Sequence, residues 1–99
     1  MAAVKILVVD DEPGIRNLVV AYLRQEQYEV YEAVDGPGAI KAARAFKPDL
    51  VILDIMLPGM SGLDVLTTLR RESDVYVILL TARTDEMDRV IGLSVGADD

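Results

Sequence analysis

Residues 50–62 read LVILDIMLPGMSG, and this stretch decides the fold. Four apolar residues lead directly into Asp54, and a turn at Pro58 and Gly59 follows. A continuous apolar run of this length, bounded by turn signals, is typical of a strand that is buried on both faces of a parallel sheet. Asp54 then lies at the carboxyl end of its strand, which is where open α/β sheets bind their ligands.

Two further apolar runs resemble the strand before Asp54. Residues 5–9 lead into Asp10 and Asp11, and residues 75–80 lead into Thr81. Residues 28–34 are rich in β-branched and aromatic residues with interspersed glutamates, which predicts a half-exposed edge strand. The sequence therefore predicts four strands, and a polar side chain follows or ends three of them.

Helical patterns separate these strands. Pro13 fits the first position of a helix whose polar face carries Arg16 and Arg24. Its predicted apolar stripe consists of Ile15, Leu18, Val19, Tyr22 and Leu23. Small alanines predict a second helix between the turn at residues 35–38 and Pro48.

Two more helices are expected further along the chain. Ser61 resembles the start of a capping box, and the helix after it is predicted to bury Leu63, Leu66 and Leu69. A fourth helix is predicted from Thr84 to Gly96. Strict alternation of strands and helices with short connections predicts one α/β domain over residues 1–99.

The predicted fold class is a flavodoxin-like (CheY-like) open parallel sheet with strand order 2-1-3-4. This order places the first and third strands side by side at the point where the strand order reverses. Asp10, Asp11 and Asp54 would then meet at one edge of the sheet.

Composition excludes several classes of function. The net charge of −7 argues against direct contact of this domain with nucleic acid or an anionic membrane. The absence of cysteine and histidine excludes disulfides, thiolate or imidazole metal ligands, and Ser-His or Cys-His nucleophile pairs. The first apolar run is too short for a signal peptide and nothing approaches a membrane span, so a cytoplasmic location is expected.

A cluster of carboxylates needs a positive charge among its members. Taken singly, Asp10, Asp11 and Asp54 can equally be helix or loop caps, and Thr81 is a common type of turn residue. Together, carboxylates without histidine or cysteine suit a hard cation such as Mg²⁺, with Mn²⁺ as the alternative. An aspartate beside such a cation and a hydroxyl donor can act as a nucleophile on phosphorus.

Several motifs resemble the receiver domain of bacterial two-component response regulators, in the right order along the whole chain. They are Asp10-Asp11 after the first strand, Asp54 before residues 56–62, Thr81-Ala82-Arg83, and residues 96–99, GADD. The sequence of residues 79–82, 92–93 and 96–99 is most similar to the OmpR/PhoB class of transcription factors.

The resemblance implies a role for each matching residue. Asp54 would be the phosphoacceptor, which takes a phosphoryl group from a phosphohistidine of a sensor histidine kinase. Asp10, Asp11, Asp54 and the backbone carbonyl of Met56 would hold Mg²⁺, and Thr81 would contact the phosphoryl group as a switch. The domain would not be an enzyme beyond slow self-dephosphorylation, and it would control a DNA-binding output domain.

The chain departs from the family pattern at its end. Receivers continue with a fifth strand, which carries a lysine, and a fifth helix, whereas no lysine follows Thr81 here. A C-terminally truncated receiver is therefore expected, with the strand at residues 75–80 as an unprotected edge. A second copy could cover that edge in an abnormal homo-oligomer, or the chain could be a fragment of a longer regulator.

Three alternatives stay open at this point. A phosphorylation-independent, receiver-like interaction module agrees with the missing lysine. A hydrolase of the aspartyl-phosphate type would want a second acid two residues after Asp54, where Met56 stands. A flavin or nucleotide carrier would want a glycine- or hydroxyl-rich loop after the first strand, where residues 10–12 are acidic.

Overall fold

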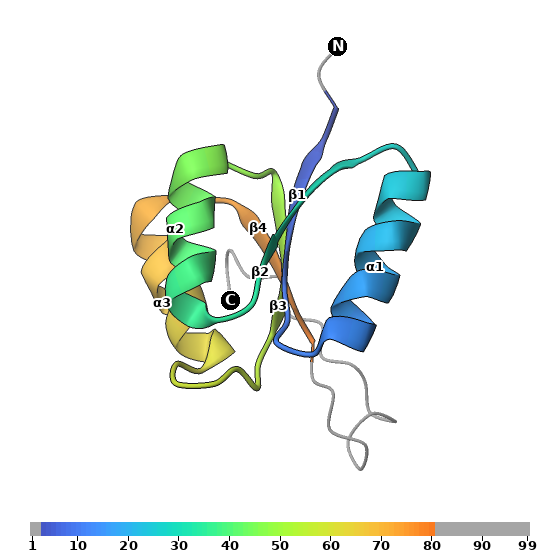
Figure 1. Ribbon diagram of the computed structural model, residues 1–99. Helices are drawn as coiled ribbons and strands as arrows, with labels where there is room; N and C mark the ends of the chain where they lie inside the picture. Colours follow the sequence, from blue (N-terminus) through green and yellow to red (C-terminus); the bar gives the residue numbers. More distant parts are fainter. Residues whose placement is uncertain (1–2, 81–99) are drawn as a thin grey trace.

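The computed structural model describes residues 3–80, in which strands and helices alternate. The elements are β1 (Lys5–Val9), α1 (Pro13–Gln25), β2 (Glu29–Ala33), α2 (Gly36–Phe46), β3 (Leu50–Asp54), α3 (Gly62–Glu72) and β4 (Tyr76–Leu80). All strand pairs are parallel, and the order β2-β1-β3-β4 confirms the prediction (Figure 1). The predicted fourth helix lies outside the described residues.

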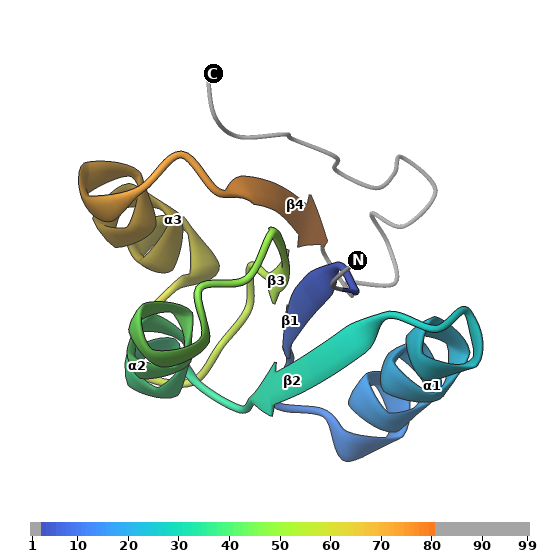
Figure 2. The same cartoon turned by 90° about the horizontal axis from the view of Figure 1, so that it is seen from above.

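Helices cover the two faces of the sheet unequally. α2 and α3 pack on one face, and α1 packs on the other beside β2 and β1 (Figure 2). The α2–α3 side contains the larger core, which includes Leu7, Val51, Leu53, Leu69 and Val77, each at most 2% exposed. The alternation of strand side chains between the two faces explains why neighbouring strand residues belong to different cores.

The prediction that β3 is buried on both faces is wrong for one face. Val51 and Leu53 are fully buried under α2 and α3, whereas Leu50 and Ile52 are half-buried on the opposite face. Ile78 and Leu80 of β4 are half-buried as well. Within residues 3–80, α1 is the helix on this face, and it covers the β2–β1 half (Figure 2). Coverage of the β4 edge by a second copy stays a prediction.

The inward face of α1 also differs from the predicted stripe. Leu18 and Tyr22 are 72% and 61% exposed, and Ile15 is 38% exposed. Leu23 is buried and Val19 is half-buried, as predicted, but the other buried side chain of the helix is Val20, which the predicted stripe did not include. The helix is turned so that positions 16, 20 and 23, which share one face at helical spacing, point toward the sheet.

Helix α3 differs from its prediction at one position. Leu69 is buried as predicted and Leu66 is half-buried, but Leu63 is 51% exposed and Val65 takes the inward place. Ser61 caps the helix, because its Oγ accepts a hydrogen bond from the N–H of Leu63 at 3.0 Å. Capping by this serine agrees with the predicted helix start.

The turn between β3 and α3 folds back tightly on the end of the strand. The N–H of Gly62 donates to the carbonyl of Ile55 at 2.9 Å. A Cβ atom on Gly62 would lie 2.3 Å from the carbonyl oxygen of Asp54 and 2.8 Å from the Cα of Ile55. Backbone against backbone cannot give way as a flexible side chain can, so this position requires glycine.

We expect Gly62→Ala to destabilise the domain by about 2–3 kcal/mol, because the added methyl group overpacks the backbone at the end of β3. Gly14→Ala is the matched control, since a Cβ there meets nothing within 4 Å. The control should keep or raise stability, by up to about 1 kcal/mol. Urea unfolding followed by far-UV circular dichroism measures the stability of both variants. Equal stability of the two would contradict the conclusion that position 62 requires glycine.

Candidate functional site

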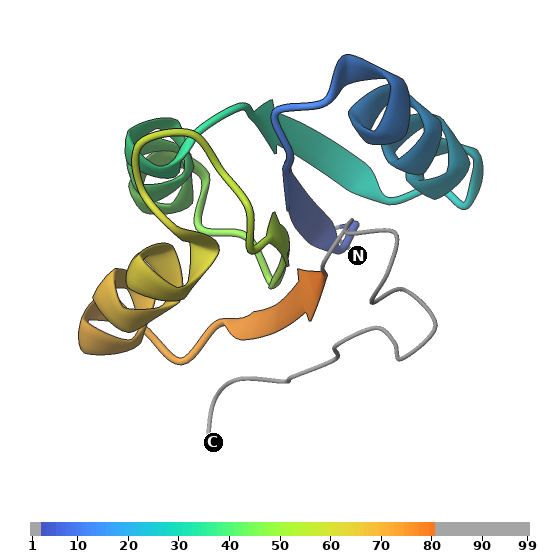
Figure 3. The same cartoon turned by 90° about the horizontal axis from the view of Figure 1, so that it is seen from below.

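Three carboxylates meet at the edge of the sheet where the strands end. β1 pairs with β3 in parallel, with Val9 opposite Leu53, so that Asp10 and Asp54 follow at the same level. Asp10, Asp11 and Asp54 each offer a carboxylate oxygen, and these oxygens all lie within 4.8 Å of one another. Figure 3 views the molecule from this end, where α1 and α3 flank the loops that leave β1 and β3.

Backbone amides orient two of these carboxylates in the same way. The N–H of Glu12 donates to Oδ1 of Asp10 at 2.9 Å, and the N–H of Met56 donates to Oδ1 of Asp54 at 3.0 Å. Each bond reaches two residues along the chain, as in the turns that aspartate side chains commonly form. The direction of both carboxylates is therefore set by the loops that follow the strands.

The same two carboxylates are buried with like charges beside them. Asp10 and Asp54 are 6% and 5% exposed, and Asp11 is exposed. Burial raises the pKa of Asp54, and the negative charges of Asp10 and Asp11 raise it further, against the lowering effect of the Met56 N–H. Burial is also the main reason why the pKa of Asp10 is raised. A divalent cation among the three carboxylates would offset both the cost of burying their charges and the repulsion between them.

The chemistry of this donor set fits a hard cation. The three side chains offer oxygen alone, which suits Mg²⁺ or Mn²⁺ better than softer metals. Met56 follows the strand by two residues and is 49% exposed, and a metal contact by its backbone carbonyl stays a prediction. Thr81 lies outside the described residues, but β4 ends at Leu80, which pairs with Asp54.

Arg16 and Glu32 lie beside the cluster, and neither position was predicted from the sequence. Arg16 was placed on the polar face of its helix, yet its side chain is 15% exposed and its Nη1 donates to the backbone carbonyl of Asp10 at 2.8 Å. Its Nε lies 3.1 Å from Oε1 of Glu32 in β2. The signal that could have found Arg16 is its i, i+4, i+7 spacing with Val20 and Leu23.

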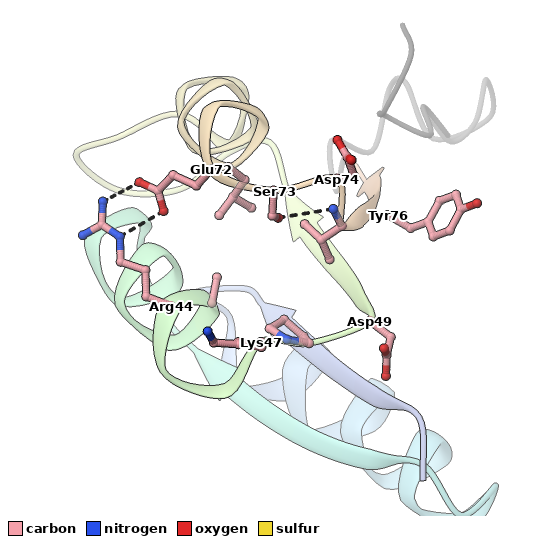
Figure 4. A pocket seen from close by; sticks show the side chains of 11 residues that line it. Arg44, Lys47, Asp49, Glu72, Ser73, Asp74 and Tyr76 are labelled. Atoms are coloured by element: carbon pink, nitrogen blue, oxygen red, sulfur yellow. Dashed lines mark hydrogen bonds and ion pairs between the residues drawn. The ribbon is translucent and has the colours of Figure 1, made fainter. Parts of the chain in front are cut away.

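A cavity of about 630 Å³ lies at the opposite end of the sheet. It is lined by the ends of α2 and α3 and the start of β4, and Arg44 and Glu72 form an ion pair beside it (Figure 4). Its lining mixes the positive side chains of Arg44 and Lys47 with the negative ones of Asp49, Glu72 and Asp74, whereas the carboxylate cluster carries one sign of charge. It is therefore a weaker candidate than the carboxylate cluster.

Comparisons with known proteins agree with this geometry. The family model described as "Response regulator receiver domain" matches residues 6–99. The DNA-binding response regulator MtrA of Mycolicibacterium smegmatis is 48% identical over 95 residues, which are 96% of this chain and 42% of that protein. The probable transcriptional regulatory protein TcrX of Mycobacterium tuberculosis is 52% identical over 97 residues, 97% of this chain and again 42% of the relative. The chain thus spans less than half the length of these relatives.

Solved structures give the same result. The response regulator TrrA of Thermotoga maritima, in complex with Mg²⁺-BeF, is similar with a TM-score of 0.77 and 44% identity, over 88% of this chain and 76% of that chain. A complex of the histidine kinase ThkA with TrrA contains a chain that is similar with a TM-score of 0.75 and 49% identity, over 80% of this chain and 69% of that chain.

No helix among residues 3–80 is long and apolar enough to cross a membrane. Fold, strand order and family match point to one assignment. The chain belongs to the response regulator receiver domain family.

Proposed function

We propose that this domain accepts a phosphoryl group on Asp54 from a phosphohistidine of a sensor histidine kinase, in a reaction that depends on Mg²⁺. The observation that carries the proposal is the set of three carboxylates within 4.8 Å at the ends of β1 and β3. Asp10, Asp11, Asp54 and the backbone carbonyl of Met56 would hold the ion. When bound, Mg²⁺ would neutralise the phosphoryl oxygens that the carboxylates otherwise repel.

The carboxylate of Asp54 is suited to the nucleophilic role. Its Oδ1 is held by the Met56 N–H, and its second oxygen accepts no hydrogen bond from residues 3–80. That second oxygen would attack phosphorus while the bond from phosphorus to the donor's imidazole nitrogen breaks and the imidazole keeps the electron pair. These 99 residues contain no histidine, so the donor imidazole lies outside this chain.

Thr81 would donate its hydroxyl to a phosphoryl oxygen and act as the switch residue. The β3–β4 pairing supports this role, because Leu80 pairs with Asp54 and directly precedes Thr81 in the sequence. The role itself rests on the family resemblance.

The partners follow from the relatives. A structural neighbour is seen with a histidine kinase, and curated relatives are called DNA-binding response regulators, which supports a kinase partner and a DNA-binding output domain in the whole protein. The net charge of −7 favours no direct contact of this domain with DNA. We propose a cytoplasmic phosphoacceptor that is not itself a turnover enzyme.

A phosphorylation-independent interaction module is the second candidate. Such a module would bind its partner without any phosphoryl transfer, so it differs from the first candidate in a measurable way. Phosphorylation in vitro separates the two candidates.

We expect the chain to gain one phosphoryl group from acetyl phosphate with Mg²⁺, and none with EDTA. Asp54→Asn should abolish the gain, because the amide is not a nucleophile toward phosphorus. Asp74→Asn is the matched control at the far end of the sheet and should be phosphorylated like the wild type. Intact-mass spectrometry measures all three proteins. A folded wild type that gains no mass would favour the interaction module.

Without a divalent cation, Asp54→Asn should raise the stability of the domain at neutral pH. The pKa of Asp54 is raised in the folded protein, so this carboxylate contributes stability below its ordinary pKa of about 3.9, and that contribution is lost as the pH rises through the folded value. Removing the charge at neutral pH should raise the free energy of unfolding by at least about 1 kcal/mol. One unit-charge repulsion at about 4 Å is worth about 1 kcal/mol in water and more at a buried site.

Urea unfolding in EDTA at pH 7 and at pH 3 measures this difference. The two proteins should converge at pH 3, where the acid is protonated in both the folded and unfolded states. Addition of Mg²⁺ at pH 7 should stabilise the wild type more than the variant. If the variant is less stable than the wild type in EDTA at pH 7, the prediction that the charge of Asp54 destabilises the folded protein is wrong.

A further inference from the structure

Arg16 reaches from the first turns of α1 to the loop that carries two of the carboxylates. Its Nη1 donates to the backbone carbonyl of Asp10 at 2.8 Å, and its Nε donates to Oε1 of Glu32 at 3.1 Å. The side chain is 15% exposed, so these bonds form largely away from water. One guanidinium thus joins the loop after β1 to the end of β2.

The bond from Arg16 is the third hydrogen bond that holds Asp10 in place. The N–H of Asp10 donates to the carbonyl of Ala33 at 3.2 Å, and its Oδ1 accepts from Glu12 at 2.9 Å. The carbonyl that Arg16 holds shares a peptide plane with the N–H of Asp11. Arg16 therefore sets the orientation of the peptide from which both Asp10 and Asp11 project their carboxylates.

We propose that Arg16 is a positioning residue for the divalent-cation site, acting through the Asp10 carbonyl. The inference rests on the proposed function, since it takes Mg²⁺ as the ion. Glu32 balances the charge of Arg16, so the arginine can lie near the cation site with little repulsion of the ion. Residues that hold ligands from outside the coordination shell typically change metal affinity about 10- to 100-fold when they are removed.

Electrostatics and positioning predict effects of opposite sign. A positive charge near the site weakens cation binding, so loss of charge alone would tighten Mg²⁺ binding in Arg16→Met. Loss of positioning would weaken it. The double variant Arg16→Met/Glu32→Gln removes one positive and one negative charge and so keeps the net charge of the wild type. It isolates the positioning effect.

The chain offers a matched control on the same helix. Arg24 has Nη2 3.9 Å from Oε2 of Glu32 and donates to the carbonyl of Val30 at 3.2 Å. The control Arg24→Met/Glu32→Gln therefore makes the same change in charge and loses the same glutamate. It leaves the bond from Arg16 to Asp10 in place. Because it also leaves Arg16 without its glutamate, any weakening of Mg²⁺ binding by the charge of Arg16 shows in this control.

The test is a Mg²⁺ titration of the full 99-residue chain, followed by the NMR signals of the Glu12 and Met56 amides, which donate to the carboxylates. Far-UV circular dichroism first selects a temperature at which every variant is folded. We expect Arg16→Met/Glu32→Gln to bind Mg²⁺ about 10-fold more weakly than the wild type, and the Arg24 control to stay within about 2-fold.

Equal Mg²⁺ affinity of the Arg16 double variant, the Arg24 control and the wild type would overturn the inference while the proposed function stands. Tighter binding by Arg16→Met with unchanged binding by the double variant would show an effect of charge alone and overturn it too. Absence of Mg²⁺ binding by the wild type would overturn the proposed function itself.

If the double variant does not fold, the conservative variant Arg16→Lys tests the same inference. Arg16→Lys keeps the charge but replaces the planar fork by a single ammonium group, which cannot reproduce both bonds in the same geometry. We expect its Mg²⁺ affinity to fall a few-fold at unchanged net charge. Wild-type affinity in Arg16→Lys would then overturn the inference.

Discussion

The parallel pairing of β1 with β3 is the constraint on which the rest of the molecule depends. It places Asp10 and Asp54 at the same level, with Asp11 beside them, and so holds three like charges within 4.8 Å. Such a cluster is unfavourable in the absence of a cation, since burial and mutual repulsion raise the pKa values of Asp10 and Asp54. The energy of the surrounding sheet keeps together groups that would otherwise separate, as functional sites often require.

The elements around the cluster hold it from several directions. Backbone amides of the two loops orient Asp10 and Asp54, and Arg16 connects the first loop to the edge strand β2. The tight turn at Gly62 presses the start of α3 against the end of β3. Helices on both faces thus contribute to the geometry at the strand ends, although α1 and α3 do not share a face.

The opposite end of the sheet is held in a different manner. Arg44 and Glu72 join α2 to α3 through a two-point ion pair beside the cavity. Both side chains are partly exposed, so the pair adds little stability by itself. The carboxylate end carries the buried charges and the constrained turn, which is consistent with a division between a functional end and a structural end of the sheet.

The sequence by itself determined the strand positions, the parallel order and the placement of aspartates at strand ends. These follow from local patterns, since an uninterrupted apolar run and a strict alternation with helices leave few topologies. Only the tertiary structure decided which face of α1 points inward, which apolar residues of the sheet stay half-exposed, and that Arg16 reaches Asp10. The physical reason is that an amphipathic pattern defines a broad stripe, and its rotation is set by what it packs against. Leu18 and Tyr22 lie at one margin of that stripe. The sheet accepts Leu23, as predicted, together with Val20 and the stem of Arg16.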